Sequence, residues 1–212
     1  MPLKTPRTTV KRLPKRGHYD AETVHAILDA GFLCHVGFVS NGQPYVIPTG
    51  FGRDGDTLYI HGSAVSRTLK TLAGGVPMCL TVTHLDGLVL ARSGFHSSMN
   101  YRSVVVLGTA SEVTGERKAH ALAVISDQIL KGRWDEIRGP TRKELNGTIV
   151  LELPLREASA KVRTGPPIDD EEDYSMPIWA GVVPLSLKAG KPLPDARLPE
   201  TIPVPGYVKR RR

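Results

Sequence analysis

Residues 59–70, Tyr-Ile-His-Gly-Ser-Ala-Val-Ser-Arg-Thr-Leu-Lys, combine residue types that can hold a phosphate group. A predicted strand ends there at a His-Gly-Ser turn, and a predicted helix follows at once. The first amides of a helix lack partners within it, and the helix dipole adds partial positive charge, so this end attracts anions. Ser63 and Ser66 add hydroxyl donors, Arg67 adds a permanent charge, and Gly62 would let a ligand approach the backbone. The alternative is a capped surface helix whose Arg67 is solvated.

His61 is the candidate catalytic residue, because it lies at the end of the same strand, beside the phosphate turn. With an ordinary pKa of about 6.5, a histidine can donate a proton to a reduced substrate or hold an anion. The alternative is a histidine that only makes a hydrogen bond within its turn.

Two further segments carry polar groups that could bind a flat heteroaromatic ligand. The first is the loop of residues 93–100, which ends at Asn100 and leads into a strand that begins Tyr101-Arg102. The second is the strand Gln-Pro-Tyr-Val-Ile-Pro-Thr-Gly-Phe (43–51), whose Pro48 interrupts the hydrogen-bond ladder and leaves neighbouring amides free. An ordinary connecting loop and an edge-strand proline are the alternatives.

Tight turns between short strands predict the architecture that must position these residues. Asn41-Gly42, Asp54-Gly55 and Asp86-Gly87 are hairpin signals. Hairpins force antiparallel neighbours, so we expect a mainly β (α+β) chain with six or more strands in an antiparallel barrel. Helices are expected at residues 20–30, capped by Asp20, at 64–73, capped by Ser63, and at 116–131. A long strand at 101–113 should bend at Gly108, and the last strand should lie within 176–187.

The net charge of +7 is concentrated at the two ends of the chain. Residues 1–18 hold six Lys/Arg and no acid, and residues 188–212 hold seven Lys/Arg and two acids. We expect a basic N-terminal arm (1–18), one domain (19–187) and a basic, Pro-containing tail (188–212), with the ends acting as solvated arms or subunit straps. The absence of interleaved aromatic residues argues against nucleic-acid binding. No apolar run suits a membrane span or a signal core, and the two isolated cysteines suit no metal site, so we expect a cytoplasmic protein without a metal.

Taken together, five segments resemble the pyridoxamine 5'-phosphate oxidase-like FMN-binding split barrels. Within them the chain is similar to the flavin-nucleotide-binding group that includes nitroimidazole-resistance reductases. The matching segments are residues 34–51, 54–70, 84–108, 159–174 and 179–185. The resemblance implies a six-stranded split β-barrel that works as a homodimer, with FMN in a cleft between the subunits.

The resemblance also implies roles for individual residues. The phosphate would lie near Ser63, Ser66 and Arg67, within reach of Lys161 or Arg163. The flavin ring would lie along Val46, Ile47, Pro48 and Thr49, with His61 facing it, and the loop residue His96 could touch substrate or, as in related proteins, a haem. True pyridoxamine 5'-phosphate oxidases carry a C-terminal Arg-Leu-His stretch that handles their substrate, and this chain lacks it. We therefore expect an FMN-dependent oxidoreductase that reduces a small electrophilic or nitroaromatic compound with an external donor such as NAD(P)H. A flavin carrier, sensor or scavenger without catalytic activity is the alternative.

Overall fold

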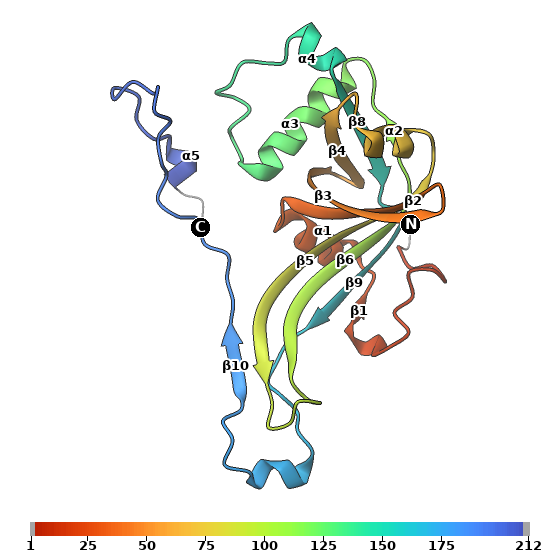
Figure 1. Cartoon of the computed structure of the whole chain (residues 1–212), viewed down its shortest axis with the longest axis vertical. Coiled ribbons are helices and arrows are strands. Elements are labelled where there is room, and N and C mark those ends of the chain that lie inside the picture. The colour runs from red at the N-terminus through yellow and green to blue at the C-terminus, as the bar shows by residue number, and fades with distance from the viewer. Residues whose placement is uncertain (1–2, 210–212) are drawn as a thin grey trace.

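The structure, a computed structural model, describes residues 3–209 and consists mainly of antiparallel strands (Figure 1). Residues 1–2 and 210–212 of the basic ends lie outside the described range. The strands are β1 (Gly17–His18), β2 (Leu33–Ser40), β3 (Gln43–Asp54), β4 (Thr57–Ser63), β5 (Pro77–Leu90), β6 (Ser98–Thr109), β7 (Ser111–Glu112), β8 (Thr148–Pro154), β9 (Glu157–Arg163) and β10 (Gly181–Pro184). The α-helices are α1 (Ala21–Asp29), α2 (Arg67–Ala73), α3 (Arg117–Ile129), α4 (Arg142–Asn146) and α5 (Gly206–Lys209).

The strands close into a barrel because β6 and β7, which follow each other directly in the chain, pair with strands at the two ends of one hydrogen-bonded path. Hydrogen bonds link the strands in the order β5-β2-β3-β4-β8-β7. β7 continues β6 after a break at Ala110, and β6 pairs with β5, so the path returns to its start. The break lies next to Gly108, where a Cβ would come within 2.8 Å of Leu153 Cδ1. The expectation of an antiparallel split barrel with a few helices is thus confirmed, with more strands than the six that form the closed path.

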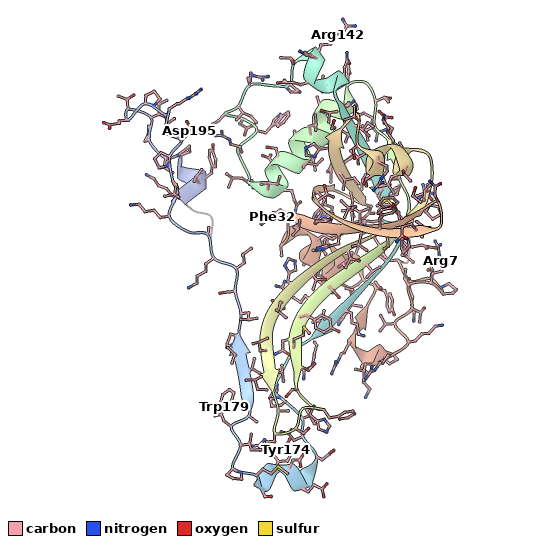
Figure 2. All side chains as sticks on the ribbon, in the orientation of Figure 1. Arg7, Phe32, Arg142, Tyr174, Trp179 and Asp195 are labelled. Atoms are coloured by element: carbon pink, nitrogen blue, oxygen red, sulfur yellow. The ribbon has the colours of Figure 1, made fainter. Side chains whose placement is uncertain are left out.

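The lower halves of β5 and β6 leave the barrel as a long curved ribbon, with β9 on one side and β10 on the other (Figure 1). Tyr174 and Trp179 lie at the far end of this ribbon (Figure 2). Trp179 is 66% exposed and Phe95, in the loop between β5 and β6, is 91% exposed. The ribbon therefore presents large apolar side chains to solvent.

Two of the three predicted hairpin turns occur, and the third is wrong. Asn41 and Gly42 adopt positive φ values of 51° and 78°, and Gly55 has a φ of 53°. β5, however, runs straight through Asp86-Gly87, because Gly87 pairs with Asn100 of β6 and the strand only shifts register there. Arg102 of β6 donates to both carboxylate oxygens of Asp86, each at 2.9 Å, and this cross-strand contact replaces the turn.

The helices at 20–30 and 116–131 are confirmed as α1 and α3, and Asp20 caps α1 by accepting from Thr23 N at 2.7 Å. The predicted cap Ser63 is wrong: it is still in β4, paired with Thr148, and α2 begins at Arg67. Ser66 caps α2 instead. The predicted last strand shrinks to β10, and the sequence patterns missed β1, β9, α4 and α5.

Two apolar layers hold these elements together. Residues such as Val36, Leu80 and Val104 fill the barrel and are at most 1% exposed. A second cluster joins Ala121 and Ile125 of α3 to Tyr59 of β4, on the outer side of the barrel wall. Gly52 lets α3 lie close to β3, since a Cβ there would be 2.7 Å from Ile125 Cα. α3 is thereby fixed against the strand that carries His61.

The first described residues pack against the barrel, whereas residues 11–15 of the same N-terminal arm are exposed. Leu3 is 6% exposed, and Ala158 N of β9 donates to its carbonyl at 3.0 Å. The tail beyond β10 is mostly exposed. Among the helices of the described residues, none has the length and apolar character to cross a membrane.

Candidate functional site

The first half of β3 has an unpaired edge. Residues 43–50 are hydrogen-bonded to β2, whereas pairing with β4 is confined to residues 51–54. Because backbone groups of a strand point alternately to its two sides, some amides and carbonyls of residues 43–50 face this open edge. Val46, at the middle of it, is 67% exposed. The edge can therefore hydrogen-bond the rim of a flat ligand.

His61 lies on β4 between two cavities. Its neighbour Ile60 belongs to the barrel core, and alternation along the strand places His61 on the opposite face, which α3 covers. Its Nδ1 is buried and has no hydrogen-bond partner. Burial also lowers the pKa of the imidazole, because the charged form is the more costly one to desolvate. Burial therefore favours the neutral imidazole, and its Nδ1 has no partner among residues 3–209.

The smaller of the two cavities, about 110 Å³, brings together most of the predicted ring-binding residues. Ile47, Pro48 and Thr49 line it from β3, His61 and Gly62 from β4, and Ser66 from the start of α2. At this volume it cannot enclose a ligand of several fused rings, but it opens next to the unpaired edge of β3.

The larger cavity beside His61, about 510 Å³, is mainly apolar. Its lining comes from α3, from the segment of residues 130–141 and from α4: Leu122, Ile125, Ser126, Ile129, Trp134, Ile137, Arg138, Pro140 and Glu144. Arg138 donates to both carboxylate oxygens of Glu144, at 2.8 and 2.5 Å. The cavity thus combines apolar walls, a rim whose charges are already paired, and the side chain of His61.

The predicted phosphate turn holds its polar groups in local contacts. Ser66 Oγ accepts from Leu69 N at 3.4 Å, and Ser63 Oγ accepts from Val65 N at 3.3 Å. The guanidinium of Arg67 lies 4.8 Å from the centre of the Tyr45 ring and is exposed. Arg67 is therefore available to an anion, although no carboxylate of the described residues holds it in place.

Asn100 and Arg163 form a second cluster at the ends of β6 and β9. Arg163 is only 7% exposed, and its Nη1 donates to Asn100 Oδ1 at 2.5 Å. Burial, together with the nearby charge of Arg16, lowers the pKa of this guanidinium. Among residues 3–209 it forms no ion pair. A buried cation of this kind is costly without an anion beside it.

Arg102 and Lys161, two other residues predicted to contact the ligand, have surroundings that differ from those of Arg163. Arg102 is paired with Asp86, and that pairing lowers the pKa of the Asp86 carboxyl. Its charge is therefore already compensated. Lys161 lies on β9 opposite Ser103, and no side-chain contact of Lys161 is found within the described chain.

The loops contribute residues that the sequence patterns missed. The side chain of Asp169 is fully buried and accepts from Arg92 N at 2.9 Å and Arg92 Nη1 at 3.0 Å. His96 is close to Asp170, with Nε2 and Oδ2 3.2 Å apart. His96 therefore already has a partner, unlike His61.

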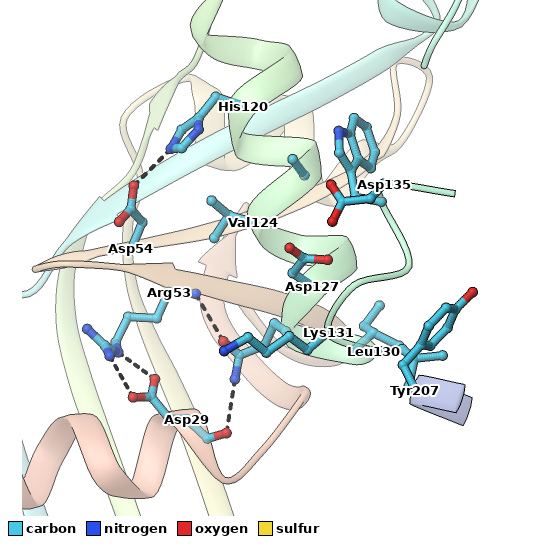
Figure 3. A pocket seen from close by; sticks show the side chains of 14 residues that line it. Asp29, Arg53, Asp54, His120, Val124, Asp127, Leu130, Lys131, Asp135 and Tyr207 are labelled. Carbon is cyan, nitrogen blue, oxygen red and sulfur yellow. Dashed lines mark hydrogen bonds and ion pairs between the residues drawn. The ribbon is translucent and has the colours of Figure 1, made fainter. Parts of the chain in front are cut away.

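A third cavity, about 1,120 Å³, lies between α1, β3, α3 and the C-terminal α5 (Figure 3). Arg53 donates to both oxygens of Asp29 at 2.6 Å, and His120 and Asp54 are 2.8 Å apart. Trp134 and Ile129 line this cavity and the His61 cavity alike. No sequence signal indicated this shared wall.

Comparisons with known proteins give consistent relatives. Residues 20–162 match the family described as pyridoxamine 5'-phosphate oxidase. A flavocytochrome from Azotobacter vinelandii is 46% identical, with a TM-score of 0.92 over 98% of this chain and 97% of that chain. An FAD and heme binding protein from Mycobacterium smegmatis is 40% identical, with a TM-score of 0.88 over 92% and 96%. A proposed 5-nitroimidazole antibiotic resistance protein from Bacteroides thetaiotaomicron is 25% identical, with a TM-score of 0.59 over 69% and 86%. The search of curated proteins gives no match.

Proposed function

Because the chain belongs to the pyridoxamine 5'-phosphate oxidase family, we propose that it is a flavin-dependent oxidoreductase that also holds a haem, working as a homodimer. The observation that carries the proposal is His61, which lines both the small cavity at β3 and the large apolar cavity and whose buried Nδ1 has no partner among the described residues. The similarity to a flavocytochrome and to an FAD and heme binding protein over nearly the whole chain supports it.

The flavin is proposed to be FAD in place of the FMN expected from the sequence. The relative that is 40% identical is described as binding FAD, and the match covers 92% of this chain. Val46–Thr49 would bind the ring edge, and Arg163 would pair with a phosphate. That pairing would relieve the cost of burying an unpaired guanidinium. Ring binding by Val46–Thr49 and phosphate pairing by Arg163 would be the same for FMN and FAD. The choice of FAD therefore rests on the relative and on the acid extraction described below.

The haem is proposed to lie in the cavity of about 510 Å³, with His61 as its iron ligand. Neutral imidazole is a common haem ligand, and apolar walls suit the macrocycle. His61 fits because burial keeps it neutral and Nδ1 is unpartnered, and this assigns it ligation in place of the proton donation expected from the sequence. Leu122, Ile125 and Ile137 would exclude water from the iron.

A bound flavin accepts two electrons from a donor and a haem exchanges them singly, so the pair suits reduction of a small electrophilic or nitroaromatic acceptor by NAD(P)H. The chain's own residues bind and orient these groups and keep water out. A carrier, sensor or scavenger is the second candidate function, since His61 is the only histidine of the described residues that lines either of the two cavities beside it. NAD(P)H oxidation by the loaded protein, with and without nitroaromatic acceptors, separates the two.

The absorption spectrum of freshly purified protein tests the proposal. We expect flavin bands together with a Soret band, and acid extraction should release FAD. Flavin bands without a Soret band would overturn the haem assignment alone, and a spectrum without either would overturn both. Extracted FMN would restore the expectation from the sequence.

A homodimer is expected because one chain leaves the site incomplete and leaves apolar surface uncovered. No contact within the described chain joins the Arg163 cluster to the His61 cavities. Trp179, Phe95 and Val46 are 66%, 91% and 67% exposed, and such patches usually mark an interface. Sedimentation at micromolar concentration should give about twice the 23.1 kDa protomer mass. A mass equal to the protomer would contradict the dimer.

A further inference from the structure

Residues 130–141 form the wall between the His61 cavity and the cavity shown in Figure 3. Trp134 faces both spaces, and Ile137, Arg138 and Pro140 complete the wall on the His61 side. Whatever holds these residues in place therefore sets how easily the His61 cavity opens.

The two ends of this wall segment are anchored locally. At its start, Gly132 has a φ of 83°, which favours glycine, and its N–H donates to Asp127 Oδ1 at 3.2 Å. At its end, Glu144 accepts from Thr141 N at 2.7 Å within a capping box. The middle, from Arg133 to Ile137, has no such anchor to the barrel in the described structure.

The middle is held by the C-terminal helix. Tyr207 of α5 donates its hydroxyl hydrogen to Glu136 Oε2 at 2.5 Å and accepts from Arg133 Nη1 at 3.0 Å. Its ring also lies beside Gly132, where a Cβ would be 4.0 Å from Tyr207 Cδ1. Figure 3 shows Tyr207 beside Leu130 and Lys131 at the edge of the cavity. One phenol therefore bridges two charged residues of the wall segment.

The chain that delivers Tyr207 is long and loosely attached. Residues 185–203 are exposed throughout, and the hydrogen bonds of residues 190–205 join near neighbours, such as Leu198 N to Asp195 O at 3.0 Å. Such a segment can detach without unfolding the barrel, because few buried contacts would be lost.

We propose that the C-terminal segment is a strap, and that Tyr207 latches it onto residues 130–141 to control opening of the His61 cavity. Its consequence for haem rests on the function proposed above, but the latch itself does not. The hydroxyl contacts are exposed and charge-assisted, so they are strong enough to bias the wall segment and weak enough to break reversibly.

Limited trypsin digestion of Tyr207→Phe tests the latch, in a background with Lys188, Lys191 and Arg197 replaced by glutamine so that trypsin does not cut the exposed strap. Arg133 and Arg138 are exposed cleavage sites within the wall segment. When opening is fast relative to cleavage, the cleavage rate follows the population of the open form. Loss of both hydroxyl contacts should speed cleavage there about threefold to tenfold. Glu136→Gln should act in the same direction, and the melting temperature should stay at the wild-type value.

Tyr19→Phe is the matched control, because that hydroxyl accepts from Val10 N at 2.7 Å, in the N-terminal arm. It should leave cleavage at Arg133 and Arg138 unchanged. An unchanged rate for Tyr207→Phe, or an equal increase for Tyr19→Phe, would overturn the latch. In protein that holds haem, Tyr207→Phe should also speed haem transfer to apomyoglobin by the same factor, and an unchanged transfer rate would overturn control of the cavity. Absence of haem would refute the proposed function while the digestion still decides the latch.

Discussion

Replacement of His61 by alanine is expected to empty the protein of haem and leave its flavin in place. His61 lines the apolar cavity, and its buried Nδ1 has no partner among the described residues. Loss of a residue that merely orients a metal ligand already costs about tenfold to a hundredfold in affinity, so loss of the ligand itself should cost at least about tenfold. Pyridine haemochrome assays should show haem per protomer falling by that factor, while flavin absorbance per protomer is kept.

His96→Ala serves as the comparison, because His96 is the alternative haem contact suggested by the sequence. Its imidazole is already close to Asp170. This variant should keep the Soret band. Loss of haem from His96→Ala together with retention in His61→Ala would reverse the assignment.

The second large effect is expected at Arg163. In Arg163→Gln, affinity for the flavin nucleotide should fall about tenfold to a hundredfold, because a hydrogen bond to a charged group contributes about 1.5–3 kcal/mol. Riboflavin, which lacks the phosphate, should bind as it does to wild type. Because the site lowers the pKa of the guanidinium, it disfavours the charge, and the neutral variant should melt at an equal or higher temperature as apoprotein. Fluorescence titration of apoprotein with both flavins measures the first two quantities.

The same titration can be applied to a second arginine, Arg67, with Arg142 as its control, because each lies in the first turn of a short helix. Arg67 begins α2 at the predicted phosphate turn, and Arg142 begins α4 in the same capped position. Arg67→Ala should weaken binding of the nucleotide but not of riboflavin, whereas Arg142→Ala should change neither. Equal losses for both flavins in Arg163→Gln would mean that Arg163 supports the fold or the ring, and the phosphate placement would be wrong.

Local signals predicted the parts of the fold that local physics decides. Asp20 caps α1, and Asn41-Gly42 makes a tight turn, because neither depends on distant residues. Asp86-Gly87 carries the same kind of signal and fails, because Arg102 and β6 hold it within a continuous strand. Ser63 fails as a cap because pairing with Thr148 of β8 keeps it extended.

The residues of the candidate site also fall into those that sequence signals identified and those that only the folded chain brings together. The sequence singled out His61, which ends a strand, and the resemblance added Val46–Thr49. The structure brings Ile47, Pro48 and Thr49 together with His61 around one cavity, while their roles in binding stay predictions. The burial of Arg163 and Asp169 could not, because each is buried by segments far away in the sequence. Trp134 and Tyr207 gave no periodic pattern, and only the folded chain brings them to one wall.

The attachment of the N-terminal residues to β9 also sets an order of events during synthesis. Leu3 accepts a hydrogen bond from Ala158, and Gly17 pairs with Lys161, so these contacts cannot form until the chain has left the ribosome as far as Lys161. β6 emerges before β9, and at typical translation rates the roughly 50 residues between them take on the order of several seconds. Through that interval the edge of β6 that β9 later covers stays open to strands of other nascent chains. The interval before β9 emerges is therefore when the growing chain is most exposed to mispairing.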